Sequence, residues 1–359
     1  MEEATHFFLG ANSGQGFQNL FEPFCRMEHH NDLLVLKGGP GSGKSTMMKK
    51  IGKAMEARGE KVEYLHCSGD PFSLDGINIP GIRTAIVDGT SPHIIEPKYP
   101  AAVERYVNLG QFYDIAAAKA ARNEIVRYTD ECSEAYRRAY RALAASRQMD
   151  ESANVLAAEG LDYGKLQRRT KGIIAREIRG IGSGGSDRYR FLESVTYSGD
   201  IVWFKSAEKI AQRIYHIYDS FSLAGSMLDQ IHEAAKARGY GSILCPDPEH
   251  MDRLRHILIP ELELAFVTIG RDVKIDSTPY RRIHIDAMVS AEHLQRWKGR
   301  LKFLVKMRKT LRQEGIESLK DAKASHDALE ALYYPRINIS GLDSCAAQEL
   351  ERIVGYLGQ

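Results

Sequence analysis

Gly38-Gly39-Pro40-Gly41-Ser42-Gly43-Lys44-Ser45 is the stretch that decides the fold expected for this chain of 359 residues. It fits the pattern G-x-x-x-x-G-K-[ST] of a phosphate-binding loop. The apolar run at residues 33–36 precedes it and predicts a buried strand, and residues 45–57 follow with apolar side chains at helical spacing. A strand, a glycine-rich loop and a helix in this order predict an anion site at the start of the helix.

The residue types of the loop indicate how it would bind a nucleotide. Glycines let successive N–H groups turn inward around a phosphate, and the start of the helix adds partial positive charge. Lys44 is expected to reach the β- and γ-phosphates as a catalytic residue, and the Ser45 hydroxyl to ligate Mg²⁺. A glycine-rich turn with a chance lysine is the alternative. The predicted nucleotide-binding residues are Gly38, Gly39, Pro40, Gly41, Ser42, Gly43, Lys44, Ser45 and Thr46.

A second motif supplies the expected metal carboxylate. Residues 84–88 form an apolar run that ends in Asp88. Downstream of a phosphate loop, this pattern is typical of the strand whose Asp holds the Mg²⁺ shell, so we predict a Mg²⁺ site at Ser45 and Asp88. An Asp that only begins a turn is the alternative.

The sequence also offers candidate groups that activate a nucleophile. No Glu follows Asp88, so a base must come from another segment. The polar loop expected at residues 68–76 supplies Asp70 and Asp75 as candidate catalytic bases, although an Asp in such a loop also caps turns. His93 is a weaker candidate, for contact with the γ-phosphate. Several arginines could stabilise a transferred phosphoryl group, and the sequence does not choose among Arg105, Arg122, Arg127, Arg137, Arg253 and Arg255.

The second half of the chain repeats the first at an offset of 180 residues. About forty residues align without a gap, with roughly a dozen identities, among them Ile51 with Ile231 and Ile77 with Ile257. The loop itself is not repeated, because bulky or uncharged residues replace its glycines and its lysine. Tyr218, Phe221, Leu223, Ala224 and Gly225 stand at the positions of Gly38, Gly41, Gly43, Lys44 and Ser45, and Thr268 stands at that of Asp88. The second copy is therefore expected to keep the fold without the nucleotide site.

These observations predict an α/β fold of two tandem phosphate-loop NTPase-like domains with parallel sheets. The intact copy spans residues 1–180, and the degenerate copy spans residues 187–359 after a Gly/Ser-rich linker. Residues 101–158 are rich in Ala, Arg and Tyr and predict a helical hairpin, with a counterpart at residues 291–334. Each copy is thus expected to carry a helical appendage.

Composition limits the classes of protein and of partner. The fractions of hydrophobic residues (43%) and charged residues (27%) are typical of a globular protein. With 49 Lys+Arg against 47 Asp+Glu, no large nucleic-acid surface is implied, although a local basic patch stays open. Five scattered cysteines without a C-x-x-C pair, no apolar run of bilayer length and the acidic beginning Met1-Glu2-Glu3 predict a cytoplasmic protein without a signal peptide.

Taken with its flanks, the loop resembles a known family. Leu36 to Thr46, Leu65-His66-Cys67-Ser68, Ser73-Leu74-Asp75-Gly76 and Val87 to His93 are similar to segments of a poorly characterised bacterial family of tandem phosphate-loop ATPases, described as ATPases or nucleotide-kinase-like proteins. The resemblance covers essentially the whole chain. It implies ATP binding and indicates no substrate. The family pattern commonly has a second phosphate loop, from which Tyr218 to Ser226 depart.

We therefore expect a Mg²⁺-dependent ATPase, an ATP hydrolase whose nucleotide state drives a conformational change. ATP is favoured over GTP because the chain has no Asn-Lys-x-Asp segment. A small-molecule or nucleotide kinase and a non-catalytic, nucleotide-dependent scaffold are the two alternatives. The expected cofactors are ATP and Mg²⁺. A protein bound by the helical hairpin and a second copy of the chain stay open as partners, whereas no membrane and no clear nucleic-acid partner are expected.

Overall fold

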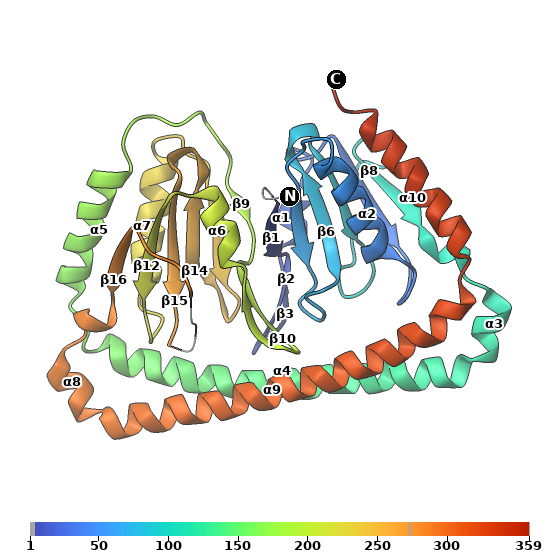
Figure 1. Cartoon of the computed structure of the whole chain (residues 1–359). Helices are drawn as coiled ribbons and strands as arrows, with labels where there is room; N and C mark the ends of the chain where they lie inside the picture. The colour runs from blue at the N-terminus through green and yellow to red at the C-terminus, as the bar shows by residue number, and fades with distance from the viewer. Residues whose placement is uncertain (1–3, 272, 274, 359) are drawn as a thin grey trace.

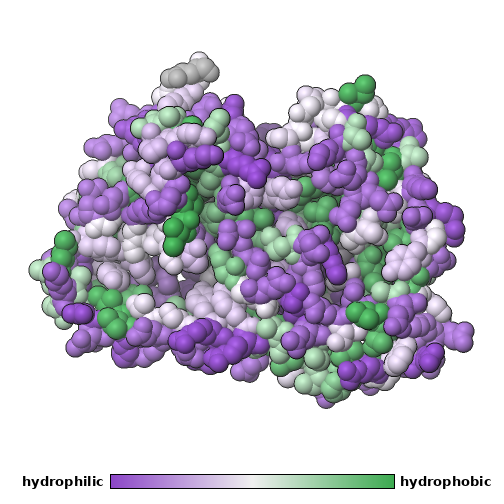
Figure 2. Space-filling model, turned by 180° about the vertical axis from the view of Figure 1, so that it is seen from behind, coloured by the Kyte–Doolittle hydropathy of each residue, from purple (hydrophilic) through white to green (hydrophobic). Residues whose placement is uncertain are grey.

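The computed structural model describes residues 4–271, 273 and 275–358, so the acidic beginning at residues 1–3 lies outside the described part. It contains two lobes, each built around a six-stranded sheet, which lie side by side on a pair of long helices (Figure 1). Seen from behind, a notch separates the lobes along the edge opposite these helices (Figure 2). The expected mixed α/β class is confirmed.

The first lobe contains the strand and helix predicted around the glycine-rich loop. Its sheet has the order β1-β5-β6-β7-β4-β8. Leu33 to Leu36 of β4 are fully buried, and α2 buries Met47, Met48, Ile51 and Met55 against the sheet. The elements of this sheet, with its covering helix, are β1 (Thr5–Phe8), β4 (Asp32–Lys37), α2 (Lys44–Glu56), β5 (Glu63–His66), β6 (Leu74–Ile79), β7 (Thr84–Asp88) and β8 (Glu104–Asn108).

One strand of this sheet changes two expectations. β6 pairs antiparallel with both β5 and β7, so the sheet is mixed and not wholly parallel. The polar loop expected at residues 68–76 ends at Leu74, where β6 begins, and the prediction is wrong for its last three residues. Every residue of β6 is buried because the strand lies between two neighbours in the sheet. Asp75 therefore lies on an internal strand.

The second lobe repeats this plan. Its sheet has the order β16-β12-β15-β14-β13-β9, and β14 pairs antiparallel with both neighbours, as β6 does. The pairing of His256 with Val267 reproduces that of Gly76 with Val87 at the offset of 180 residues. The elements are β9 (Arg188–Tyr189), α6 (Phe204–Ile210), β12 (Arg213–Tyr218), α7 (Gly225–Lys236), β13 (Ile243–Asp247), β14 (His250–Ile259), β15 (Leu264–Ile269) and β16 (Arg281–His284).

Both halves of the chain contribute to the region between the lobes. A small antiparallel sheet joins β2 (Gly10–Ser13) and β3 (Gly16–Asn19) to β10 (Glu193–Thr196) and β11 (Gly199–Val202). One buried cluster includes Phe7, Phe8 and Val87 from the first half and Phe191 and Val267 from the second. The lobes therefore share a hydrophobic core.

The expected helical hairpin within each half is wrong. Residues 101–158 contain β8, two short helices (η2, Leu109–Phe112, and α3, Ile115–Ala120) and one long helix of 37 residues, α4 (Arg122–Ala158). α4 has no Gly or Pro at which the chain could reverse. The apolar stripe of α4 packs instead against α9 (Lys298–Tyr333), which runs antiparallel to it from the other half (Figure 1). Leu143 of α4 meets Gly315 at this contact, where a Cβ atom on the glycine would stand 2.9 Å from the leucine side chain.

The shorter helices at the ends of the long pair are exchanged between the lobes. α5 (Tyr163–Glu177) follows α4 and packs on α7 of the second lobe, whereas α10 (Ile339–Val354) follows α9 and packs on α2 of the first. Each lobe is thus completed by a helix from the other half. The remaining short elements are α1 (Phe21–Phe24), η1 (Pro80–Ile82), η3 (Pro260–Leu262), η4 (Asp286–Met288), α8 (Ala291–Arg296) and η5 (Tyr334–Arg336). Within the described residues, no helix combines the length and apolarity that a membrane span requires.

Candidate functional site

The glycine-rich loop connects the end of β4 at Lys37 to the start of α2 at Lys44. Its backbone needs glycine at defined positions. Gly41 and Gly43 have φ angles of 71° and 82°, in the left-handed region. A Cβ atom on Gly38 would stand 2.5 Å from the Ser42 Oγ, so a larger residue would displace that side chain.

The N–H groups of this loop have few acceptors of their own. Within the described part of the chain, those of Gly41, Gly43 and Ser45 donate to no backbone or side-chain acceptor. Ser42 Oγ is buried and also has no hydrogen-bond partner there. Backbone N–H groups at a helix start normally find an acceptor in a cap, in water or in a ligand. These N–H groups are therefore available to a water molecule or to a ligand.

Lys44 lies folded over this loop. Its Nζ donates to the carbonyl oxygens of Gly38, at 2.5 Å, and Gly39, at 3.0 Å, and it lies 3.6 Å from the Asp88 carboxylate. Both side chains of the ion pair are largely buried. Burial raises the pKa of Asp88 above its usual range, and the opposing effects of Lys44 and of the Thr90 N–H only partly offset this increase.

Sheet register places Asp88 beside the loop. β4 and β7 are parallel, and Leu36 pairs with Asp88 at the edge where the loop begins. Thr90 then fixes the turn after β7, because its N–H donates to Asp88 Oδ1 (2.8 Å) and its hydroxyl donates to the Gly38 carbonyl oxygen (3.0 Å). The two sequence motifs, 52 residues apart, thus meet at one sheet edge.

The predicted metal ligands are chemically suited to Mg²⁺. Ser45 Oγ accepts a hydrogen bond from the N–H of Leu74 at 3.0 Å, which holds the hydroxyl against the start of β6. Asp88 Oδ2 faces Lys44, while its Oδ1 is held by Thr90. A hydroxyl and a carboxylate are hard oxygen ligands of the kind that Mg²⁺ prefers together with phosphate oxygens. Both residues therefore fit the ion.

Asp75 reaches the same edge from β6. Its Oδ2 lies 3.4 Å from Nε2 of His93, both side chains are buried, and this oxygen has no hydrogen-bond partner among the described residues. Burial alone would lower the pKa of His93, but the Asp75 carboxylate outweighs burial, and the pKa is raised. The charges of Asp88 and Lys44 also act on His93. The structure thus brings together Lys44, Asp75, Asp88 and His93.

Asp70 has different surroundings. Its carboxylate accepts hydrogen bonds from the N–H of Phe72 and the hydroxyl of Ser73, both at 3.1 Å, which closes a turn. It also lies 3.6 Å from Nζ of Lys323, a residue of α9. Its role as a base stays a prediction, and the observed contacts are those of a turn cap.

Residues distant in the sequence cover the outer side of the loop. The position of a Cβ atom on Gly41 lies 3.4 Å from the Glu330 carbonyl oxygen and from Cβ of Tyr333, at the end of α9. Tyr113 donates to the carbonyl oxygen of Pro40 at 2.8 Å, and its ring lies 5.0 Å from that of Tyr333. No local motif marks these residues. Tyr113 follows β8, which pairs with β4, whereas Glu330 and Tyr333 reach the site from the second half of the chain at the end of α9.

Five of the six candidate arginines divide into two groups, those bound to carboxylates and those exposed on a helix. Arg105 forms a bidentate contact with Asp32, at 2.8 and 2.9 Å, and bonds Glu349 of α10, so its visible role is to hold that helix. Arg255 of the second lobe is mostly covered and forms an ion pair with Glu193. Arg122, Arg127 and Arg137 lie exposed on α4.

The corresponding loop of the second lobe contains its own anion. The Asp219 carboxylate accepts hydrogen bonds from the N–H groups of Phe221 (3.1 Å) and Ala224 (2.7 Å) at the start of α7. The loop is also one residue shorter, since Ile217 pairs with Thr268 where Leu36 pairs with Asp88, whereas Met227 matches Met47. The gapless alignment across this loop is therefore wrong by one position.

Comparisons of the chain with protein-family models, with curated proteins and with solved structures found no match. The candidate site consequently rests on its own geometry.

Proposed function

We propose that the chain binds ATP with Mg²⁺ at residues 38–46 and hydrolyses it. The observation that carries the proposal is the set of N–H groups without acceptors at Gly41, Gly43 and Ser45, with the Lys44 ammonium directly beside them. The contrast with the second lobe supports it, because there the Asp219 carboxylate already accepts hydrogen bonds from the N–H groups of Phe221 and Ala224 in the corresponding loop. That the ligand is ATP and not another phosphate compound is proposed from the sequence alone. The same holds for the resemblance to tandem phosphate-loop ATPases.

Several residues have defined tasks in this proposal. Lys44 would exchange its two carbonyl contacts for the phosphate oxygens, which carry formal charge and bind an ammonium more strongly. Ser45 and Asp88 would hold Mg²⁺, which supplies charge neutralisation at the phosphates. Asp75 is the proposed base, since its unpartnered oxygen lies at the same sheet edge and His93 balances its charge.

The contact between the loop and α9 supports a coupling function. α9 ends against Gly41 and has 36 residues, so it extends about 54 Å from the loop across both lobes. A phosphate group that orders or displaces this loop would change the contacts of Glu330 and Tyr333. The proposed output of ATP turnover is therefore a movement of α9 relative to the lobes.

Nucleotide titration of two lysine variants tests binding. Lys44→Ala removes the ammonium beside the loop, and a charge-assisted contact is worth about 1.5–3 kcal/mol, so ATP affinity is expected to fall at least about tenfold. Lys53→Ala is the matched control, because Lys53 lies exposed on the same helix. Calorimetry should show unchanged affinity for the control. Equal affinities of wild type and Lys44→Ala would contradict the proposed site.

Phosphate release by two aspartate variants tests the chemistry. Asp75→Asn should retain ATP affinity and lose about a hundredfold or more in turnover, a typical contribution of a positioned base. Asp70→Asn, in the turn that contacts Lys323, is the matched comparison and should stay within a few-fold of wild type. Release of ADP only in the presence of a phosphate acceptor would favour the kinase alternative, and binding without any turnover would favour the scaffold.

A further inference from the structure

A strongly basic segment begins α9. From Arg296 to Arg312 the chain has eight Lys or Arg residues and no Asp or Glu. The chain as a whole is nearly neutral, so this segment concentrates positive charge at one end of the molecule. In Figure 1, α8 and the beginning of α9 lie at the left end of the helical pair, far from the glycine-rich loop.

Most of this charge is free to meet a ligand. Arg296, Lys298, Arg300, Lys302 and Lys306 are exposed, and none of them forms an ion pair with a carboxylate among the described residues. Two acidic residues on α4 pair with other cations, since Asp150 pairs with Arg308 and Glu151 pairs with Arg147. Among the described residues, the five exposed side chains are therefore outside the ion pairs of the structure.

Helical spacing aligns part of this charge. Lys298, Lys302 and Lys306 are four residues apart, so they form one row with a step of about 6 Å along the helix axis. Arg300 and the half-exposed Phe303 lie three residues apart on α9, and Arg296 is the last residue of the preceding helix α8. A row of cations at this step matches a chain of phosphates in an extended polynucleotide strand.

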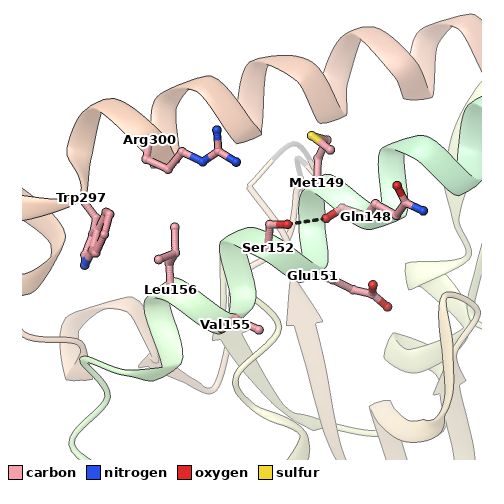
Figure 3. Close-up of a pocket in the computed structure, with 8 residues that line it drawn as sticks. All are labelled: Gln148, Met149, Glu151, Ser152, Val155, Leu156, Trp297 and Arg300. Atoms are coloured by element: carbon pink, nitrogen blue, oxygen red, sulfur yellow. Dashed lines mark hydrogen bonds between the residues drawn. The ribbon is translucent and has the colours of Figure 1, made fainter.

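A groove beside Arg300 adds aromatic surface. Between α4 and α9 lies a cavity of about 720 Å³, lined by Met149, Ser152, Leu156, Trp297 and Arg300 among others. In Figure 3 the Trp297 ring, the Leu156 side chain and the Arg300 guanidinium lie in the space between the two helices. Figure 2 shows hydrophobic patches among hydrophilic ones along this lower edge. An indole beside an open cavity can stack against a planar base.

We propose that this basic segment, with Trp297 and the groove, binds single-stranded nucleic acid. The phosphates would lie along the row of lysines, and a base would enter the groove to stack on Trp297. A duplex offers no unstacked base for that groove, and a lipid surface offers no planar group. A single strand can therefore use both the row of lysines and the groove, whereas a duplex or a lipid surface can use only the positive charge. This inference is independent of ATP binding.

Fluorescence anisotropy of a labelled strand tests the row of lysines. The probes are oligo-dT and oligo-U of about 20 nucleotides, with a duplex of equal length and phosphatidylserine vesicles as the competing polyanions. The combined variant Lys298→Ala, Lys302→Ala, Lys306→Ala should bind at least about tenfold more weakly. Its plot of log affinity against log salt should lose about 2 units of slope, at 0.7 for each contact with a single strand. The control combines Lys53→Ala, Lys61→Ala and Lys236→Ala, three exposed lysines outside the segment.

Tryptophan fluorescence tests the groove. The chain has two tryptophans, so Trp203→Phe leaves Trp297 as the only indole. Quenching of its emission by oligo-dT, and not by vesicles, is the expected result of stacking. Circular dichroism of each variant verifies that it is folded. Equal binding by the lysine variant and its control, tighter binding of duplex or vesicles than of single strands, or unquenched Trp297 with a strand bound would each overturn the proposal.

Discussion

Asp75 and His93 are buried together, and their charges depend on each other. The His93 imidazole contacts the rings of Phe21 and Phe17, with centroids 4.5 and 5.1 Å away. These rings cover the imidazole where it does not face Asp75. Burial disfavours its charged form, the carboxylates of Asp75 and Asp88 favour it, and Lys44 opposes it. The net effect raises the pKa of His93 above its usual 6.5.

This pKa shift predicts how stability depends on pH. Because the pKa is higher in the folded state, the pair contributes its full stability below pH 6.5 and loses it as the pH rises through the raised value. His93→Gln should therefore destabilise the protein more at about pH 6 than at about pH 8.5. Urea unfolding of wild type and variant at the two pH values measures this difference. An equal cost at both values would show that the pKa of His93 is the same in the folded and the unfolded protein. In an Asp75→Asn background, where burial is the largest remaining effect, His93→Gln should no longer cost more at about pH 6 than at about pH 8.5.

For single residues, the sequence could predict the members of the glycine-rich loop but not the side chains that surround the loop in the fold. The loop from Gly38 to Ser45 is identified locally, because each spacing follows from phosphate geometry. Asp88 follows from the parallel register of β4 and β7. The burial of Asp75 could not be predicted from a polar stretch, since it depends on β6 entering the sheet between two other strands.

Among the elements, the two strand–loop–helix units differ in what accepts hydrogen bonds from their loops. In the second lobe the Asp219 carboxylate accepts from the N–H groups of Phe221 and Ala224, whereas in the first lobe no described group accepts from those of Gly41, Gly43 and Ser45. Burial raises the pKa of Asp219, and the hydrogen bonds from Ala224 and Phe221 oppose that increase. A loop with its own buried acceptor has no need of a ligand to satisfy it.

This substitution of a carboxylate for a ligand leads to a prediction for Asp219. Asp219→Ala leaves the N–H groups of Phe221 and Ala224, in the loop before α7, without their acceptor, so the free energy of unfolding should fall by about 1–3 kcal/mol. Asp229→Ala, at an exposed position of the same helix, should change it by less than about 0.5 kcal/mol. Denaturant unfolding measures both. Wild type should bind one ATP analogue per chain, and a second site that survives Lys44→Ala would contradict this account of the second loop.

The long helices show where sequence periodicity is informative and where it is not. The helical character of α4 and α9 could be predicted because each carries a regular apolar stripe. The packing partner of each helix could not be predicted, because an apolar stripe indicates that one face of the helix is buried but not which surface covers that face. The close contact of Gly315 with Leu143 is the kind of detail that favours a pair formed by the two halves of the chain over a hairpin within one half.

For the whole molecule, the exchange of helices makes the two halves interdependent. α10 covers α2 and places Ala346 and Ile353 in the core of the first lobe, while α5 places Leu166 and Ile173 in that of the second. The domain limits expected at residues 180 and 187 stay a prediction about the sequence repeat. In packing, each lobe needs both halves. A movement of α9 where it contacts the glycine-rich loop would reach its basic beginning through one continuous helix.

Cleavage of the chain between the two halves tests this interdependence. Residues 183–186 are exposed, and a protease site inserted between Ser183 and Gly184 would allow the folded protein to be cut there. The two fragments should elute together in gel filtration with their circular dichroism unchanged, because the shared core, the α4–α9 pair and the exchanged helices still hold them. Expressed separately, residues 1–183 and residues 184–359 should each be poorly soluble, since α4 or α9 would expose the stripe that its partner covers. Co-expression should restore the complex. Two fragments that separate after cleavage, each keeping its fold, would show that the lobes are autonomous domains and that the exchange of helices contributes little to stability.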